Sequence, residues 1–224
     1  MSKRFDGKVV VVLSPTLPAF LSRYPKLRLQ VIAVDRAVDL IAEHIDLALR
    51  VRTDLTTDAA LTMRTLGRSQ RILVAAPSVA SALTTGSIAE LDRLPSLGSS
   101  NEPGEVAWHL VGPDGTLHVH RHEPRMTCED FSALRDAAAA GLGVALLPDH
   151  VCQADLDTGR LVRVFPGWGG RTGIVHLVFT TRRGLPPAVR ALIDHLAGVF
   201  RDGAATGNPS PRRGEASRRA APPG

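Results

Sequence analysis

The chain has 224 residues and a mass of 23.9 kDa, enough for one large domain or two small ones that bury roughly 70% of the unfolded surface. Hydrophobic residues make up 44% and charged residues 22% of the sequence, and no run of 18 apolar residues occurs, which excludes a membrane-spanning or disordered protein. The net charge is +5, and aromatic residues amount to 4%.

The basic residues are not gathered on a DNA-reading element. The last 23 residues hold four arginines against Asp202 and Glu215, so two of the five net charges lie there. We find neither a helix-turn-helix motif nor the interleaved aromatic rings that single-stranded nucleic acids stack on. Exposed arginines in a tail would add only weak, salt-sensitive attraction, so we expect no direct reading of DNA by this chain.

The cysteine and N-terminal patterns indicate a cytoplasmic protein. Cys128 and Cys152 are 24 residues apart and form no CxxC motif. The first 25 residues lack the long apolar segment and the small-residue cleavage site of a secretory signal. We therefore expect free thiols and no contact with a membrane.

The first part of the chain alternates strands with short helices. Lys8–Leu13 is a β-branched run that ends at Ser14, which can cap a helix, and Pro25 ends that helix. The predicted elements, in order, are a strand at 8–13, a helix at 14–25, a strand at 27–33, a short helix at 38–41 and a strand at 46–51. This alternation is typical of a parallel sheet covered by helices on both faces.

The remainder repeats the alternation. The predicted elements are a strand at 71–76, a short helix at 87–91, a helix at 130–140, strands at 144–147, 161–165 and 174–180, and a final helix. Gly141 supplies the left-handed turn that ends the helix before it. The final helix has the most regular apolar stripe, from Val189 to Phe200, and should pack on a sheet. Beyond Arg201 the apolar spacing is lost, which predicts a disordered basic tail.

The pattern predicts an α/β protein with two lobes, each a mostly parallel sheet flanked by helices, because the last strand and helix return to the first section. The predicted segments are 1–70 for the first part of lobe I, 71–164 for lobe II, 165–201 for the return to lobe I, and 202–224 for the tail. Small ligands bind in open sheets at the carboxyl ends of the strands, so we expect a ligand in the cleft between the lobes.

Six segments, taken together and in order, resemble the effector-binding domain of LysR-type transcriptional regulators, whose fold is similar to that of periplasmic binding proteins. They are Leu17–Pro25, Leu27–Val51, Ala59–Pro77, Arg135–Pro148, Gly159–Trp168 and Gly173–Leu196. One segment alone would be a weak signal, but the ordered set is specific. We expect a chain that lacks the family's N-terminal winged helix-turn-helix. Either the loop before the first helix is deleted here, or the first strand is missing.

The resemblance places the start of the first helix at the ligand cleft. There the hydroxyls of Ser14 and Thr16, with the free N–H groups of the helix, would hold a carboxylate. The alternative is that these residues only cap the helix.

The resemblance also places two polar turns of the second lobe at the cleft. They comprise Ser99, Ser100, Asn101, Thr127 and Cys128. The alternative for the second turn is that Thr127 or Glu129 caps the helix that follows.

Other candidate chemistry is absent or weak. His118, His120 and His122 alternate, and on a strand they would share one face. Side chains two residues apart on a strand are too parallel to converge on zinc, and no Cys or acidic partner completes a ligand set, so we interpret this face as solvated. No GxSxG motif occurs, and Gly141-Leu-Gly143 follows a helix rather than a strand, unlike a dinucleotide-binding turn. We expect no catalytic residues, no metal and no cofactor.

The resemblance implies the effector-sensing domain of a LysR-family DNA-binding transcriptional regulator, which binds a small anionic metabolite between its lobes. It also implies a homo-oligomer or a mixed dimer with LysR-type regulators, and DNA contact only through a winged helix-turn-helix absent from this chain. The alternatives are a stand-alone cytosolic solute-binding protein without DNA-binding activity, and a small enzyme on a doubly wound sheet.

Overall fold

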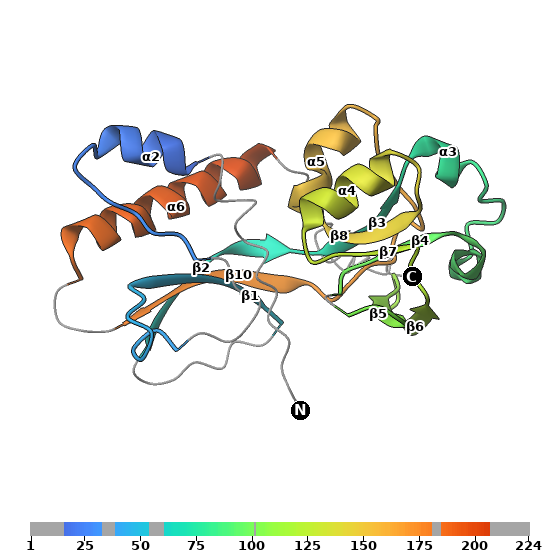
Figure 1. Cartoon of the computed structure of the whole chain (residues 1–224), viewed down its shortest axis with the longest axis horizontal. Helices are drawn as coiled ribbons and strands as arrows, with labels where there is room; N and C mark the ends of the chain where they lie inside the picture. Colours follow the sequence, from blue (N-terminus) through green and yellow to red (C-terminus); the bar gives the residue numbers. More distant parts are fainter. Residues whose placement is uncertain (1–15, 33–38, 54–60, 101, 181–184, 207–224) are drawn as a thin grey trace, which may run out of the picture.

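Two β-sheets with helices packed on them organise the protein into two lobes (Figure 1). This computed structural model describes residues 16–32, 39–53, 61–100, 102–180 and 185–206. One lobe consists of a three-stranded sheet with helices α2 and α6, and the other of a five-stranded sheet with helices α3, α4 and α5. The predicted two-lobed α/β architecture is therefore confirmed.

The first lobe is a sheet of three strands under a long amphipathic helix. The strands β1 (Leu47–Arg52), β2 (Leu61–Ser69) and β10 (Gly173–Thr180) have the spatial order β1-β10-β2. Helix α6 (Pro187–Thr206) packs on the sheet through Ile193 and Leu196, which meet Leu177 of β10 in one buried cluster. Helix α2 (Leu17–Arg23) lies beside α6 (Figure 1), where the ring of Phe20 is 5.1 Å from that of His195.

The second lobe has a five-stranded sheet and a separate hairpin. The sheet has the order β7-β4-β8-β3-β9. Its strands are β3 (Arg71–Ala75), β4 (Ser96–Gly98), β7 (Met126–Thr127), β8 (Val144–Pro148) and β9 (Val162–Arg163); the hairpin strands are β5 (Val106–Val111) and β6 (Leu117–His122). The helices are α3 (Pro77–Ala80), the 3-10 helix η1 (Ile88–Arg93), α4 (Phe131–Ala139) and α5 (Asp149–Asp157).

Strand β3 separates two hydrophobic cores because its side chains alternate between the faces of the sheet. Ile72 and Val74 belong to the core that contains Phe131 and Leu134 of α4. Leu73 belongs to the core on the opposite face, with η1 and the hairpin. A strand buried on both faces accounts for the continuous apolar run that predicted it.

The expectation of mostly parallel sheets is wrong for the described strands. In the first lobe β10 runs antiparallel to both β1 and β2. In the second lobe β4 is parallel to β7 and β8, but β3 is antiparallel to β8 and β9. Strand β2 leads into β3 through Gln70 alone, so β3 begins at the end of its sheet nearest the first lobe, where β8 ends. The strands that carry the chain between the lobes therefore run against their neighbours.

Several predicted boundaries also need correction. Residues 27–32 form no strand. Helix α6 continues past Arg201 to Thr206, so the prediction of disorder is wrong for residues 202–206. Two alanines in this last part of the helix favour the helical conformation. Gly141 has a φ of 81°, which confirms the predicted left-handed turn after α4. The predicted strand at 8–13, residue 38 and the tail from 207 fall outside the described residues. The predicted short helix at 38–41 is wrong in its described part, because residues 40–44 form a turn.

A buried carboxylate joins α4 to α5. The side chain of Asp155 is 8% exposed, and its Oδ2 and Oδ1 lie 3.2 Å from Nε of Arg135 and 2.9 Å from Nη1 of Arg160. A buried charge is tolerated only when it is paired and hydrogen-bonded, so both arginines are needed to keep this carboxylate inside.

We predict that Asp155→Ala lowers the free energy of unfolding by about 1–3 kcal/mol, because both ion pairs are lost and two arginines are left beside the vacated site. Chemical denaturation at pH 7 measures this change. The matched control is Asp157→Ala, an exposed carboxylate of the same helix, which should change the free energy by no more than about 0.5 kcal/mol. Equal effects of the two substitutions would contradict the assignment.

Candidate functional site

One edge of the five-stranded sheet faces the first lobe. Arg71, the first residue of β3, pairs with Pro148, the last residue of β8. Because β4 and β7 run parallel to β8, their carboxyl ends lie on this same edge. Strand β2 enters the second lobe here through Ser69 and Gln70. We call the ends of β4, β7 and β8 together with the start of β3 the inter-lobe edge.

The two polar turns predicted in the second lobe meet at the inter-lobe edge. Gly98 of β4 pairs with Thr127 of β7, and the backbone N–H of Cys128 donates to the carbonyl oxygen of Gly98 over 3.1 Å. Ser100 is buried, and its hydroxyl donates to the carbonyl of Glu102 and accepts from the N–H of Glu102, both at 3.0 Å. Asn101 falls outside the described residues. The ligand-binding role of Ser99, Ser100, Thr127 and Cys128 stays a prediction.

Helix α4 is capped by its own carboxylate. Asp130 is the N-cap, and its Oδ1 accepts from the N–H of Ser132 at 2.8 Å. The N–H of Asp130 lies 3.2 Å from Sγ of Cys128 and donates to it. The expectation that Thr127 or Glu129 caps this helix is therefore wrong. Since an acidic cap already compensates the positive end of the helix, a bound anion needs other partners.

Thr16 lies in the other lobe, directly before α2. Thr16 is the N-cap residue of α2, but its side chain makes no capping hydrogen bond. The alternative that its hydroxyl only caps the helix is therefore wrong. Its carbonyl oxygen accepts from the N–H of Phe20 at 3.2 Å and lies 3.1 Å from Nε2 of His195 on α6. Ser14 falls outside the described residues. The structure thus joins the two turns of the second lobe and places Thr16 with α6.

Four residues that the sequence did not single out tie the lobe crossing to α5. The hydroxyl of Ser69 lies 3.3 Å from Oδ1 of Asp149 and 3.2 Å from Nδ1 of His150. The N–H of Gln70 donates to Oδ2 of Asp149 at 3.4 Å, and the N–H of Asp149 donates back to the carbonyl of Gln70 at 2.9 Å. Burial raises the pKa of Asp149, but the hydrogen bonds from His150 and Gln70 outweigh it and hold the pKa below its ordinary value.

A positive charge stands beside the start of α4. The guanidinium of Arg71 lies 5.6 Å from the ring centroid of Phe131, a cation–π distance. Burial lowers the pKa of Arg71, although an arginine keeps its charge at neutral pH. The sequence predicted Arg71 only as the first residue of a strand; its place on the inter-lobe edge follows from the pairing with Pro148.

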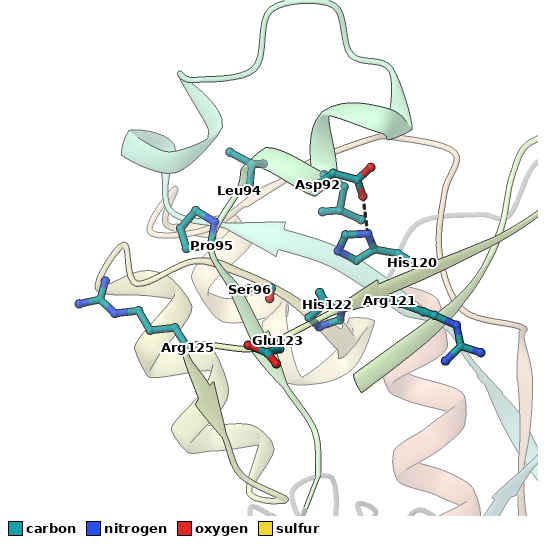
Figure 2. Close-up of a pocket in the computed structure, with 10 residues that line it drawn as sticks. Asp92, Leu94, Pro95, Ser96, His120, Arg121, His122, Glu123 and Arg125 are labelled. Atoms are coloured by element: carbon teal, nitrogen blue, oxygen red, sulfur yellow. Dashed lines mark hydrogen bonds and ion pairs between the residues drawn. The ribbon is translucent and has the colours of Figure 1, made fainter. Parts of the chain in front are cut away.

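The histidine face of β6 points inward, which corrects the prediction of a solvated face. His120 is 3% exposed, whereas Leu117 and Val119 on the opposite face are 64% and 47% exposed. Trp108 of β5 pairs with His120, so the imidazoles share the inner face with the large apolar residues of β5. A pocket of about 440 Å³ adjoins them, lined by η1, β6 and the turn after β6 (Figure 2).

Within the described ranges, no group of three or more His, Cys, Asp or Glu side chains is placed to hold a metal ion. In that part of the chain, no helix is both long and apolar enough to cross a lipid bilayer.

A two-lobed α/β fold with polar turns on the edge between the lobes is typical of proteins that hold a small ligand between two halves. The profile of the LysR substrate binding domain matches residues 9–201. The chain therefore belongs to the LysR substrate-binding domain family.

Relatives of known sequence and structure agree with this family. An uncharacterized HTH-type transcriptional regulator of Haemophilus influenzae is 28% identical over 187 residues, which cover 82% of this chain and 63% of the relative. The HTH-type transcriptional regulator PtxR of Pseudomonas aeruginosa is 27% identical, covering 82% of this chain and 58% of the relative. The full-length structure of AphB, a virulence activator of Vibrio cholerae and a member of the LTTR family, superposes with a TM-score of 0.73 at 25% identity, covering 85% of this chain and 65% of AphB. The chain spans about 60% of the length of the two curated relatives.

We predict that Asp149→Asn lowers the free energy of unfolding by about 1–2 kcal/mol at pH 7, because hydrogen bonds to a charged acceptor are weakened. The pKa of Asp149 is lower in the folded protein than its unfolded value of 3.8. The ionised carboxylate therefore stabilises the fold above pH 3.8, and this stabilisation is lost as the pH falls through the pKa of the folded state. Denaturation at several pH values should show the difference shrinking below pH 3.8. The control is Asp114→Asn, a substitution in an exposed loop. A difference in the free energy of unfolding between Asp149→Asn and the unchanged protein that does not depend on pH would refute the interpretation.

Proposed function

We propose that this chain is the effector-sensing domain of a cytoplasmic LysR-family transcriptional regulator, and that it binds a small anionic metabolite between its lobes without catalysing a reaction. The observation that carries this proposal is the meeting of the turns at Ser99–Ser100 and Thr127–Cys128 on the inter-lobe edge. The proposed lobes comprise residues 1–70 with 165–201, and residues 71–164.

The proposed ligand contacts divide by their chemistry. Thr127 and Ser99 supply hydroxyl groups and Cys128 a thiol, while Ser14 and Thr16 supply hydroxyls from the first lobe. Ser100 shapes its turn through Glu102. Arg71 adds the positive charge that favours an anionic ligand, since a cation in a partly desolvated position attracts a carboxylate more strongly than one in water.

The proposed mechanism is a shift between two arrangements of the lobes. A ligand changes this equilibrium only by binding one arrangement more tightly than the other. The crossing at Ser69 and Gln70 is held to α5 by Asp149, so the lobes move about a connection that is itself anchored. In the proposed regulator, dimers transmit the change to winged helix-turn-helix domains, which contact the DNA.

We predict that a thermal-shift screen of small carboxylates and aromatic acids yields ligands that raise the melting temperature by mass action. Thr127→Val keeps the β-branched shape but removes the hydroxyl, so the affinity for such a ligand should fall about fivefold, the equivalent of roughly 1 kcal/mol. Isothermal titration calorimetry measures the change.

The matched control for this prediction is Ser78→Ala. Ser78 is an exposed residue of α3, which follows β3 at the edge of the sheet opposite the inter-lobe edge. The Ser78→Ala variant should therefore bind the ligand with the same affinity as the unchanged protein. Chromatography of the incubated ligand detects turnover. Consumption of the ligand would favour the enzyme alternative, and an unchanged affinity of Thr127→Val would remove this turn from the site.

We also predict that the purified chain self-associates or forms mixed dimers with a full-length LysR-type regulator. Analytical ultracentrifugation at micromolar concentration and co-purification with such a regulator measure this. A monomer that co-purifies with no related regulator would contradict the proposal and favour a stand-alone solute-binding protein.

A further inference from the structure

Three imidazoles form a continuous stack on the inner face of β6. The ring centroids of His120 and His122 are 4.6 Å apart with their planes at 18°, and those of His118 and His120 are 6.5 Å apart at 17°. Trp108 meets His122 edge-on at 4.3 Å, and Trp168 meets His118 at 5.8 Å. We call His118, His120 and His122 the histidine column. It is separate from the inter-lobe edge.

The histidine column is buried at its centre, His120, and half-buried at His118 and His122, and its ring nitrogens are short of hydrogen-bond partners. Nδ1 of His120 lies 2.9 Å from Oδ1 of Asp92 on η1 (Figure 2). In the described part of the chain, Nε2 of His118, Nε2 of His120 and both ring nitrogens of His122 are buried without a hydrogen bond of good geometry, and the backbone of His120 gives His122 only a weak contact. A buried polar atom without a partner is costly, and natural proteins keep few of them. The unusual concentration of such atoms here calls for a functional explanation.

The surroundings of His120 and His122 favour the neutral form of these two imidazoles. Burial lowers the pKa of His120, and the hydrogen bond and charge of Asp92 offset this only in part. Burial, reinforced by His120, lowers the pKa of His122 to about 4. Because these values lie below the 6.5 of an unfolded histidine, the packed arrangement is most stable above pH 6.5 and loses stability as the pH falls toward 4.

The carboxylates around the column do not compensate the positive charge of a second proton, once His120 and His122 are both protonated. The charged and titratable groups near His120 and His122 are Asp92 on η1, Glu105 before β5, His118 and Arg121 on β6, and Glu123 and Arg125 after β6. Asp92 bonds to His120, while Glu105 is held by Arg121 at 3.0 Å. Two protonated rings stacked at 4.6 Å would share the single bonded carboxylate, so like charges would face each other in a desolvated space.

The β5–β6 hairpin is joined to the rest of the lobe mainly through the side chains of its inner face. It forms its own two-stranded sheet, and among the described residues its strand contact with the body of the lobe is a bridge between Val111 and Gly169. Its inner face packs through Trp108, Leu110 and the histidine column. The bridge holds one end of the hairpin. At the other end, beyond His122, the N–H of Arg125 donates to the carbonyl of Ser96 over 2.9 Å, so the segment between these two attachments is held against η1 by the contacts of its inner face.

We infer that the histidine column is a proton-sensitive latch, which holds the β5–β6 hairpin against η1 while it is neutral and releases the hairpin when His120 and His122 take up protons. The pocket beside η1 brings solvent to the edge of the column (Figure 2). This latch needs no effector and does not rest on the proposed function.

Hydrogen–deuterium exchange on the full chain tests the latch. After correction for the intrinsic rates, peptides that cover residues 105–123 should show an opening equilibrium about 30-fold larger at pH 5 than at pH 8, the ratio for one group with a pKa of 6.5 when released and about 4 when latched. Peptides from β3 and β8 should show no such rise. An unchanged hairpin at pH 5 would overturn the inference.

Variants separate the column from general acid sensitivity. His122→Phe keeps an aromatic ring beside Trp108 and should reduce the pH dependence, and the double change His120→Asn with His122→Phe should abolish it. The control is His109→Phe, on the exposed face of β5, which should keep the full 30-fold rise. Pronounced pH dependence in the double variant would overturn the latch.

A measurement on the unchanged protein guards against variants that fail to fold. Nuclear magnetic resonance of the imidazole carbons follows each histidine as the pH falls. Titration of His122 well below pH 6.5, together with opening of the hairpin, supports the latch. Titration of His122 near 6.5 with the hairpin still protected at pH 5 overturns it.

Discussion

The crossing from β2 to β3 through Gln70 is the constraint on which the arrangement of the protein depends. A single residue between two strands leaves no room for a helix, so β3 must enter the second sheet at the edge nearest the first lobe. Its antiparallel pairing with β8 then determines that β8, β4 and β7 all end on that edge. The polar turns meet there because of strand direction, although Ser99 and Thr127 are far apart in the sequence.

The same edge carries the beginnings of two helices, and this determines its electrostatics. Asp130 compensates the start of α4, and Asp149 at the start of α5 also accepts from Gln70 at the crossing. Both carboxylates are therefore occupied by backbone amides of the chain itself. In the proposed function, an anion at this edge is therefore recognised by Arg71 and by hydroxyl groups rather than by the starts of α4 and α5.

Elements with strong local patterns could be predicted from the sequence, and contacts between distant segments could not. Strands β3 and β10 are continuous apolar runs, and α6 has a regular stripe, so each carries its own signal. The hydroxyl of Ser69 and the carboxylate of Asp149, by contrast, are 80 residues apart, and neither stands in a recognisable motif. The direction of the strands was predicted wrongly because the alternation rule assumes a helix between successive strands, and the lobe crossing has none.

The orientation of the histidine face shows how register decides what alternation alone leaves open. In Leu117–His122 the apolar residues Leu117 and Val119 alternate with histidines, and burying the apolar set would put the imidazoles in water. The hairpin turn closes with the N–H of Gly112 donating to the carbonyl of Thr116 at 2.8 Å, which pairs Val111 with Leu117 and hence Trp108 with His120.

Strand β5 has the larger apolar surface on the face of Trp108 and Leu110, and both side chains are buried. Since paired residues point to the same side of a sheet, burying that face of β5 carries His118, His120 and His122 inward with it and leaves Leu117 exposed. The more hydrophobic strand therefore determines which face of its partner is buried. The imidazoles of β6 therefore pack in a core that their own sequence does not predict, and this burial lowers the pKa of His120 and His122.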